Sequence, residues 1–502
     1  MRVELVLASL FAAAIAPSEP AFGAEWQPPG IVTSQSALGE VLAAYAQASG
    51  AGNARLAQRH ERWAYVNGSR NIAVLVAVRG ADFRTSLELD GLTYTAGRSD
   101  GVRWRGDGNG IVHGVSADLQ GDAVDRAPRA VFPLDAASCK LAGEAQLPAP
   151  AWVVETDPAG DKPAFLYVDK ASGSIVREVM RDGKRVVTTA FDRFEALDGV
   201  LRARHWRVDD GYSYDALDVT VESIELGSVT AADVAFPMRR VLAPVAPLES
   251  SVELRSSFFR DRVKLEVKIE GARHWFELDT GTASITVDPG IARLHGGTTL
   301  EHAVLPGFAV GPLQLDRASA LSIPPFNLDG ILGLDFFFGH VVEIDYRHER
   351  VRVLSPGDAR KVFANPQTAI VAANVDQGLP LVHAGFGLAQ GDDFAIDTGS
   401  LRLYVMRPFA LRFEKEIAAH WTVAGRSFIE HYLEGAIQVQ PYTVSRFNFG
   451  PAQARDLTVG VQLPTALPDD LAIPFDGIIG TDILRNFDVY FDYDNGRLGV
   501  RH

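Results

Sequence analysis

The residues in this sequence that could perform chemistry lie in two copies of the triplet Asp-Thr-Gly, at 279–281 and 397–399. Each copy follows a short apolar run, as expected for a strand that ends in a loop. Two carboxyl groups that face each other cannot both ionise readily, so they share a proton and can activate a water molecule. The triplets therefore predict an acid–base pair, Asp279 and Asp397, and a bell-shaped rate profile that peaks below neutral pH.

A second motif, Asp-Gly-Ile-apolar-Gly-x-Asp, follows each triplet, at 329–335 and at 476–482. The segments 329–353 and 476–500 align without a gap at an offset of 147 residues, and 10 of 25 positions are identical. The triplets are offset by only 118 residues, so the second copy carries 29 extra residues between its motifs. Because internal repeats decide the architecture, we predict a duplicated fold that brings the two Asp residues together.

The residues after each Asp suit a reactive carboxylate. We expect each Thr side chain to turn inward and hydrogen-bond across the two-fold axis, which would lock the two loops. The Gly lets the next backbone N–H approach the carboxylate closely, and the hydroxyl that follows can hydrogen-bond the outer carboxylate oxygen. These supporting residues are Thr280, Gly281, Thr282, Thr398, Gly399 and Ser400.

As a set, the motifs Phe-x-Leu-Asp-Thr-Gly-Thr, Asp-Gly-Ile-Leu-Gly, Ile-Asp-Thr-Gly-Ser and Asp-Gly-Ile-Ile-Gly resemble aspartic proteases of the retropepsin-like and pepsin-like superfamily. The resemblance covers about 255–355 and 370–502. It implies two retropepsin-like lobes, 246–360 and 361–502, fused in tandem as a bilobed β fold. Each lobe would donate one Asp to a cleft where water attacks a peptide carbonyl. It further implies an aspartic endopeptidase with peptide or protein substrates, no cofactor, no metal and no need to dimerise.

Composition excludes several other classes of function. The net charge of −15 argues against nucleic acid and against an anionic membrane surface as partners. The 12 His residues form neither a His-Glu-x-x-His motif nor a cluster, which disfavours a zinc hydrolase. The motif Gly-x-Ser-x-Gly is absent, which disfavours catalysis by a serine nucleophile. The glycine-rich stretch 106–110 lies between expected strands, so we interpret it as a hairpin turn.

Residues 1–23 are typical of a signal peptide. Leu5 to Ala16 is apolar but too short to span a bilayer, and Ala21-Phe22-Gly23 offers a cleavage site before Ala24. We therefore expect an exported protein, periplasmic or secreted. No later stretch is long and apolar enough for membrane insertion. The single Cys139 forbids an internal disulfide, so stability must come from the size of the core.

Residues 24–245 predict a β-rich accessory domain. Leu38, Val41, Leu42 and Tyr45 recur at helical spacing after two serines, at 34 and 36, that could cap a helix. Short alternating runs separated by turns then predict a large antiparallel sheet. One helix on such a sheet resembles, in pattern only, the half-barrel of periplasmic lipoprotein carriers. The Pro-rich stretch 237–250 is the expected linker, and 406–419 predicts a helix in the 29-residue excess.

Other repeated residues are interpreted as structural. We expect the later aspartates to cap a helix start or close a strand end, and the tyrosines to lie in the core. These residues are Asp335, Asp482, Asp345, Asp492, Tyr346 and Tyr493.

Two alternatives remain beside catalysis. In one, the protease-like half is catalytically inactive and the protein binds a peptide or lipid ligand. In the other, residues 24–245 act as a prosegment that covers the cleft.

Overall fold

The structure is a computed structural model, and it describes most of the chain from residue 28 to residue 502. The predicted signal peptide, its cleavage site and part of the predicted linker lie outside the described residues. The gaps in the description are 51–54, 68–69, 90, 101, 111, 115–133, 135, 147–148, 157–163, 183–184, 210–216, 236–241, 296–301, 323–327, 376–377, 432–435, 464–472 and 474.

The prediction of a mainly β protein is confirmed, because three sheets account for most of the described elements. The chain divides into two compact units. Unit 1 contains the described parts of 28–106 and 114–238, and unit 2 those of 107–113 and 239–502. No helix in the described part of the chain is long and apolar enough to cross a membrane.

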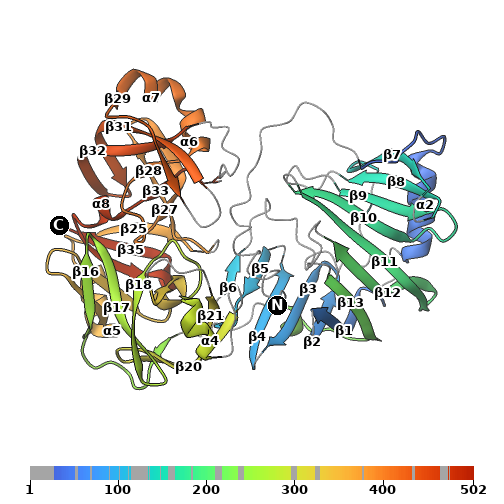
Figure 1. Ribbon diagram of the computed structural model, residues 1–502, viewed down its shortest axis with the longest axis horizontal. Coiled ribbons are helices and arrows are strands. Elements are labelled where there is room, and N and C mark those ends of the chain that lie inside the picture. Colours follow the sequence, from blue (N-terminus) through green and yellow to red (C-terminus); the bar gives the residue numbers. More distant parts are fainter. Residues whose placement is uncertain are drawn as a thin grey trace. The chain divides into compact units, whose positions relative to one another are not determined.

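Unit 1 is built on a 13-stranded sheet in the order β6-β5-β4-β3-β2-β1-β13-β12-β11-β10-β9-β8-β7 (Figure 1). Neighbouring strands from β5 round to β7 pair antiparallel, so the sheet is a long meander in which β13 returns beside β1. The strands are β1 (Gln58–Asn67), β2 (Arg70–Arg79), β3 (Asp82–Leu89), β4 (Leu92–Ser99), β5 (Val102–Gly106), β6 (Val112–Gly114), β7 (Cys139–Ala145), β8 (Ala151–Thr156), β9 (Ala164–Asp169), β10 (Ile175–Asp182), β11 (Arg185–Leu197), β12 (Val200–Asp209) and β13 (Leu217–Leu226), followed by the short helix η3 (Ala232–Val234).

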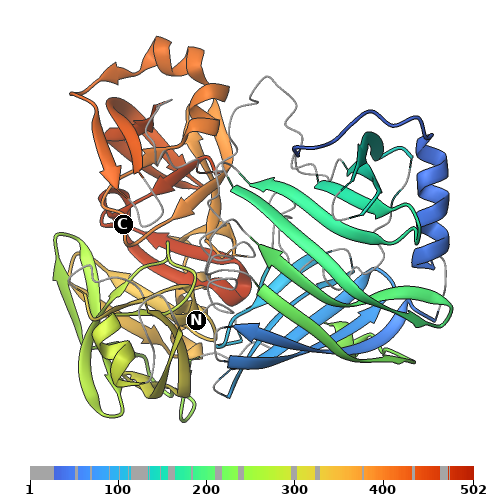
Figure 2. The ribbon, with the colours of Figure 1, turned by 45° about the vertical axis from the view of Figure 1, so that its right-hand side comes forward.

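Helix α2 (Leu38–Ser49) packs along this sheet, as Figure 2 shows. Its buried residues Val41 and Tyr45 lie in one apolar cluster with Leu166 and Val168 of β9. The expected serine caps are wrong: Ala37 is the N-cap, and its backbone N–H donates to the Glu40 carboxylate. The two serines hydrogen-bond to β7 and β8 side chains instead.

Unit 2 contains an eight-stranded and a 14-stranded sheet. Elements of the first repeat are β14 (Ala243–Pro244), β15 (Val252–Leu254), β16 (Ser256–Phe259), β17 (Arg262–Ile269), β18 (Ala272–Leu278), β19 (Thr286–Val287), α4 (Pro289–Leu294), β20 (His302–Val310), β21 (Leu313–Ser322), β22 (Gly330–Leu332), η4 (Leu334–Phe337), β23 (Val341–Asp345), β24 (Arg350–Leu354) and α5 (Pro356–Ala364). Those of the second are β25 (Ala369–Asn374), β26 (Leu381–Phe386), β27 (Ala389–Ile396), β28 (Tyr404–Val405), α6 (Arg407–Arg412), α7 (Glu414–His420), β29 (Thr422–Val423), β30 (Phe428–His431), β31 (Ala436–Phe449), β32 (Ala452–Gln462), β33 (Gly477–Ile479), α8 (Thr481–Leu484), β34 (Asp488–Asp492), η5 (Tyr493–Asn495) and β35 (Arg497–Arg501).

The two repeats share one pattern of strand pairing. In the first, β18 pairs parallel with β22, β19 pairs antiparallel with β22, and β19 pairs parallel with β21. In the second, β27, β28, β33 and β32 occupy the same relations. The sequence repeat is therefore also a repeat of topology, and each Asp-Thr-Gly follows the strand that pairs parallel with the second motif.

The 29-residue excess of the second repeat folds partly as α6 and α7. We predicted a single helix over 406–419, but the helix breaks at Phe413. Phe409 of α6 is fully buried and packs against Phe394 of β27 and Phe413, with ring centroids 5.3 Å and 4.7 Å away. The insertion is thus anchored by aromatic packing beneath the strand that carries Asp397.

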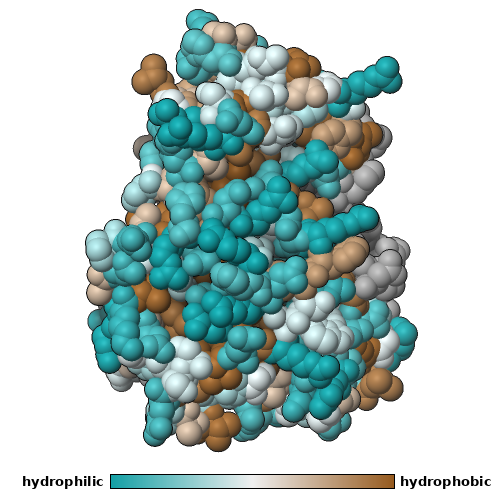
Figure 3. Space-filling model, turned by 90° about the vertical axis from the view of Figure 1, so that its left-hand side faces the viewer, coloured by the Kyte–Doolittle hydropathy of each residue, from teal (hydrophilic) through white to brown (hydrophobic). Residues whose placement is uncertain are grey.

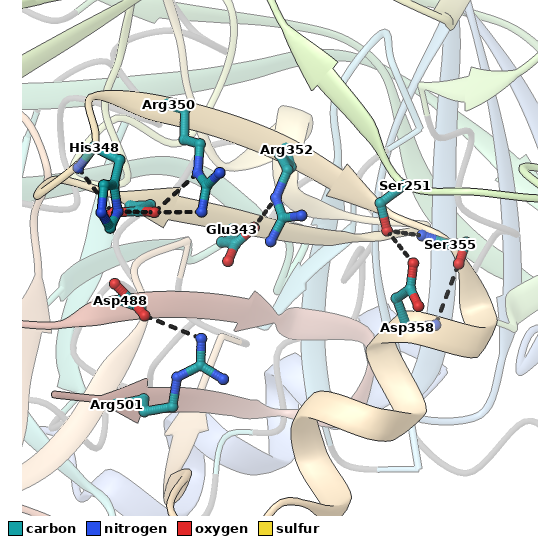
Figure 4. A network of polar contacts seen from close by, with 10 residues as sticks. Ser251, Glu343, His348, Arg350, Arg352, Ser355, Asp358, Asp488 and Arg501 are labelled. Atoms are coloured by element: carbon teal, nitrogen blue, oxygen red, sulfur yellow. Dashed lines mark hydrogen bonds and ion pairs between the residues drawn. The ribbon is translucent and has the colours of Figure 1, made fainter.

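Strand β23 of the first repeat pairs antiparallel with β34 of the second, and this pairing joins the repeats. Several side chains of the shared sheet form ion pairs, as Figure 4 shows for Arg350 and for Arg352 with Glu343. Asp345 contacts Arg350 at 2.9 Å, and the equivalent residues Asp492 and Arg497 lie 2.7 Å apart. Both repeated aspartates therefore close a strand end, as expected.

One face of the molecule, shown in Figure 3, is mostly polar: hydrophilic side chains predominate on it, and apolar ones form small, separate patches. Most of the buried apolar residues of unit 2 lie in one large cluster that runs through both repeats. A core of this size suits a chain with one cysteine, because burial stabilises by about 25 cal/mol per Å² of apolar surface.

Candidate active site: a facing carboxyl pair

Asp279 and Asp397 occupy equivalent loops held by the second motif of their own repeat. The Asp279 backbone N–H donates to the carbonyl of Leu332 at 3.0 Å, and that of Asp397 to the carbonyl of Ile479 at 3.0 Å. Each Asp is therefore fixed by a buried apolar strand, β22 or β33. Both carboxyl residues are only half-buried, so water can reach them.

The two threonines cross-link the loops. The Thr280 hydroxyl donates to the carbonyl of Ile396 at 2.7 Å, and the Thr398 hydroxyl donates to that of Leu278 at 2.8 Å. Each hydroxyl also accepts the backbone N–H of the opposite threonine, at 3.0 and 3.1 Å. Both threonines are fully buried, so these four bonds have no competition from water and fix the distance between the two Asp loops.

The glycines allow the carboxyl groups to approach. A Cβ at residue 281 would lie 2.6 Å from Cγ of Asp397, and a Cβ at residue 399 would lie 2.4 Å from Cγ of Asp279. Any larger residue would displace the opposite carboxyl group. The Gly281 N–H donates to Asp279 at 2.8 Å and the Gly399 N–H to Asp397 at 2.9 Å. Glycine therefore serves both the contact across the axis and the local hydrogen bond.

The hydroxyls that follow the triplets differ between the two repeats. The Thr282 hydroxyl donates to Oδ2 of Asp279 at 3.0 Å. We expected the same of Ser400, but its hydroxyl donates to the carbonyl of Arg402 at 3.2 Å. Instead, the backbone N–H of Ser400 donates to Oδ1 of Asp397 at 2.9 Å, the oxygen that also receives the Gly399 N–H. The pair is therefore not symmetric in its donors.

This asymmetry favours a proton on Asp397. Withdrawal from water and the neighbouring Asp279 carboxyl, which also hydrogen-bonds to it, raise the pKa of Asp397 well above its ordinary value. Both backbone donors of Asp397 converge on Oδ1, which leaves Oδ2 to carry the proton. Asp279 receives one donor on each oxygen, an arrangement that suits a carboxylate.

The last Asp of each second motif lies behind its loop. Asp335 accepts the backbone N–H of Ile285 at 3.2 Å, and Asp482 accepts that of Leu403 at 3.1 Å. Burial raises the pKa of Asp335 well above its usual range and that of Asp482 to about 6. Both therefore support the backbone after the Asp loop rather than contact the pair. The expectation that they cap a helix start is wrong, because the N-caps of η4 and α8 are Gly333 and Gly480 and neither helix has a side-chain cap.

The repeated tyrosines lie in the core, as expected. Tyr493 is 1% exposed and Tyr346 8% exposed. Each contacts a ring of the first repeat: Tyr346 contacts Phe258, with centroids 6.0 Å apart, and Tyr493 contacts Phe337, with centroids 5.5 Å apart.

Sequence reasoning missed two residues near the site, Asp107 and Asn109. The turn that contains them does join two neighbouring strands, β5 and β6, as the hairpin interpretation expected. That interpretation did not include that the segment belongs to unit 2 and that its side chains are buried. The signal was present in the sequence, since Gly-Asp-Gly-Asn-Gly is unusually polar and compact. Nothing in the sequence showed what it would contact.

Among the residues that the structure describes, no group of three or more His, Cys, Asp or Glu side chains could hold a metal ion.

Comparisons with known proteins give no match to a family model or to a curated protein. Among solved structures, the chain is similar to a LolA superfamily protein from Nitrosomonas europaea, at 10% identity and a TM-score of 0.32, over 39% of this chain and 97% of that one. It is similar to a DUF1329 family protein from Desulfovibrio piger, at 16% identity and a TM-score of 0.30, over 39% and 97%. It is also similar to an aspartic proteinase from Irpex lacteus, at 10% identity and a TM-score of 0.31, over 50% and 97%.

These findings correct the family assignment made from the sequence. The likeness to the proteinase, at 10% identity and a TM-score of 0.31, does not show that family, and the other two similar structures are a LolA superfamily and a DUF1329 family protein. We therefore do not assign the chain to the aspartic protease family. The function proposed below therefore rests on the geometry of the carboxyl pair alone.

Proposed function

We propose that this protein hydrolyses peptide bonds with a water molecule activated by Asp279 and Asp397. The observation that supports the proposal is the facing pair itself, with the glycine of each loop packed against the carboxyl group of the other. A carboxyl pair costs stability, because burial and like charge both oppose ionisation. The reciprocal threonine bonds hold the pair in this arrangement nevertheless.

The hydrogen-bond donors that Asp279 and Asp397 receive suggest a different role for each residue. Asp279 is the carboxylate, and it takes a proton from the water as the water oxygen attacks the carbonyl carbon. Asp397 gives its proton to the carbonyl oxygen, which becomes a hydroxyl of the tetrahedral intermediate. Asp279 then passes the water's proton to the leaving nitrogen, the C–N bond breaks, and Asp397 recovers a proton from the hydroxyl as the carbonyl reforms.

The pH dependence follows from the shared proton. Catalysis needs one proton on the pair, so both removal of that proton and addition of a second one abolish activity. The raised pKa of Asp397 extends the active range upward from the ordinary range of a carboxyl group, about 4. We expect a bell-shaped profile with its maximum below neutral pH.

Cleavage of a mixed peptide library between pH 3 and pH 8 tests this proposal. The purified protein should cleave, and Asp279→Asn and Asp397→Asn should each abolish cleavage, although both variants fold like the wild type by circular dichroism. Library products would also report the residues preferred on either side of the bond. Activity that rises steadily through pH 8, or cleavage retained in either variant, would contradict the proposal.

A second candidate is a binding protein without catalysis, which takes a peptide or lipid ligand. Two observations favour it. The Ser400 hydroxyl faces away from Asp397, so one carboxyl group lacks the donor that its partner has. The 13-stranded sheet of unit 1 is also far larger than a hydrolytic site requires.

Ligand binding can be separated from catalysis with the same variants. If the protein is only a binder, neither the wild type nor a variant releases products from the library. A ligand carried through purification would then appear in denaturing mass spectrometry of protein extracted with organic solvent. Product release that depends on both Asp residues would reject this candidate.

A further inference from the structure

The turn Asp107–Gly110 is embedded in the first repeat of unit 2. The Asn109 side-chain amide donates to the Ser319 carbonyl at 2.9 Å, and its oxygen accepts the Ser319 backbone N–H at 2.7 Å. Asn109 therefore satisfies both backbone groups of one residue of β21, as a neighbouring strand would. Asn109 is 1% exposed and Ser319 3% exposed, so water cannot replace these bonds.

The same turn reaches the loop behind Asp279. The second amide hydrogen of Asn109 is directed at Oδ2 of Asp335, 2.8 Å from the amide nitrogen. That oxygen also accepts the Ile285 backbone N–H. The Ser284 hydroxyl, one residue earlier, donates to Oδ2 of Asp107 at 3.2 Å. Two side chains of the turn thus hold the backbone that continues from the catalytic loop.

Asp107 and Asp335 form a second carboxyl pair. Asp107 is 3% exposed and Asp335 2% exposed, and Asp107 lies within hydrogen-bonding reach of Asp335. Oδ1 of Asp335 receives no N–H or O–H donor from the described residues. Contact between two buried negative charges is unfavourable, so this position favours a proton shared by the two carboxyl groups.

The groups that face Asp335 are Asp107 and Asn109 from the turn and the Ile285 N–H from the catalytic loop. Ser319 from β21 faces Asn109 through its backbone. Burial and Asp107 raise the pKa of Asp335, while the Asn109 amide and the Ile285 N–H lower it. The opposing donors are neutral, so they offset only part of the like-charge repulsion.

We propose that the Asp107–Gly110 turn is a proton-dependent strap on the first repeat, which holds the loop after Asp279 while Asp107 and Asp335 share a proton and loosens when both ionise. This inference goes beyond the hydrolytic function, because it needs no substrate and no cleavage. It also bears on the prosegment hypothesis. Removal of 24–245 would take Asn109 away and leave Asp335 and the Ser319 backbone without these partners.

The direction of the pH effect follows from linkage. When the turn is docked, Asp107 and Asp335 bind their shared proton more tightly than two separated carboxyl groups do. Below about pH 4 separated carboxyl groups are protonated as well, so docking then costs no free energy for taking up a proton. The penalty grows as the pH rises from there through the raised pKa of the pair, and it then stays constant. The strap is therefore tight in acid and loose at higher pH.

Hydrogen exchange of the full-length protein, measured by mass spectrometry at pH 4.5 and pH 7.5 and corrected for the intrinsic exchange rate, tests the strap. The amides to follow are those of Asn109, Ile285 and Ser319, each of which is hydrogen-bonded within this network. In the wild type, we expect their protection to fall about tenfold or more at the higher pH, since one pKa unit corresponds to a factor of ten.

Three variants make the result decisive. Asp107→Asn and Asp335→Asn each remove one charge and keep the shape of the side chain, and each should abolish the fall in protection. Asp482→Asn alters the equivalent residue of the second repeat and should leave the fall unchanged. Wild-type protection that is equal at the two pH values would overturn the proposal, as would a fall that persists in both strap variants. Neither reading depends on whether the protein cleaves peptides.

Discussion

The two repeats of unit 2 share one topology but surround their carboxyl groups differently. In the first, Thr282 donates to Asp279, and a turn from an earlier part of the chain reaches Asp335. In the second, the Ser400 hydroxyl faces away from Asp397, and Asp482 accepts the Leu403 N–H as Asp335 accepts the Ile285 N–H. The repeats therefore share the cross-linked pair of Asp loops and one support behind each loop. They differ in the hydroxyl beside the carboxyl group and in the turn that reaches Asp335.

The contacts between the two Asp loops are the same in both repeats, whereas some of the contacts on the far side of each loop differ. Reciprocal bonds such as those of Thr280 and Thr398 require the same residue on both sides, because each hydroxyl serves the backbone of the other loop. Contacts behind a loop have no counterpart to match. The second repeat could therefore accept an insertion containing α6 and α7, and the first could accept a turn from elsewhere.

The largest effect expected is loss of catalysis at the shared pair. Asp279→Asn and Asp397→Asn should each lower kcat by about 10²–10⁴-fold, because each removes one partner of an acid–base pair. The double variant should be no worse than either single variant, since residues that act as a unit are not additive. Rates with one peptide substrate for the three variants check this. If the two single variants lose unequal amounts of activation free energy, and the double variant loses their sum, the two Asp residues act separately.

The next effect is on stability, and it should be equal in the two repeats. Thr280→Ala and Thr398→Ala each leave one buried N–H and one buried carbonyl without a partner, at about 1–3 kcal/mol for each group. Urea unfolding measures the loss in the free energy of unfolding. Thr→Ser at the same positions keeps the hydroxyl and should restore most of it. A loss confined to one threonine would show that the bonds are not reciprocal in solution.

A smaller effect on activity should distinguish Thr282 from Ser400, whose hydroxyls follow the two triplets. Thr282→Val removes a donor to Asp279, and a hydrogen bond to a charged group contributes about 1.5–3 kcal/mol, so activity should fall at least about tenfold. Ser400→Ala removes only a bond to a carbonyl and should change activity less than about twofold. The pH–rate profile of each variant provides the test. Equal losses would indicate that Ser400 turns toward Asp397 when substrate binds.

A further effect concerns the stability supported by Asp482, whose pKa burial raises to about 6. Because the folded state binds this proton more tightly, stability is highest below about pH 4 and falls as the pH rises toward 6, by about 3 kcal/mol in total. Asp482→Asn should remove this fall. Unfolding in urea at pH 4, 5, 6 and 7 gives the curve, and a wild-type curve parallel to that of the variant would reject the assignment.

Much of the candidate site could be anticipated from the sequence because its contacts are local or symmetric. The spacing of the two motifs predicted which strand holds each Asp, and the repeat predicted that the two carboxyl groups would face each other. The glycines could be assigned a role for the same reason, since a close approach permits few other residues. Errors arose where a side chain had a choice of partners, as with Ser400 and with the serines near α2.

What the sequence by itself determined is the mainly β character, the duplication and the identity of the facing residues, all of which follow from periodicity and repetition along the chain. What only the tertiary structure decided is which oxygen of each carboxyl group receives which donor, and that Asn109 lies against Ser319, 210 positions further along the chain. The reason is physical. A polar turn such as Gly-Asp-Gly-Asn-Gly satisfies its own backbone equally well in water or in a protein interior, so only the folded chain reveals which of the two it occupies.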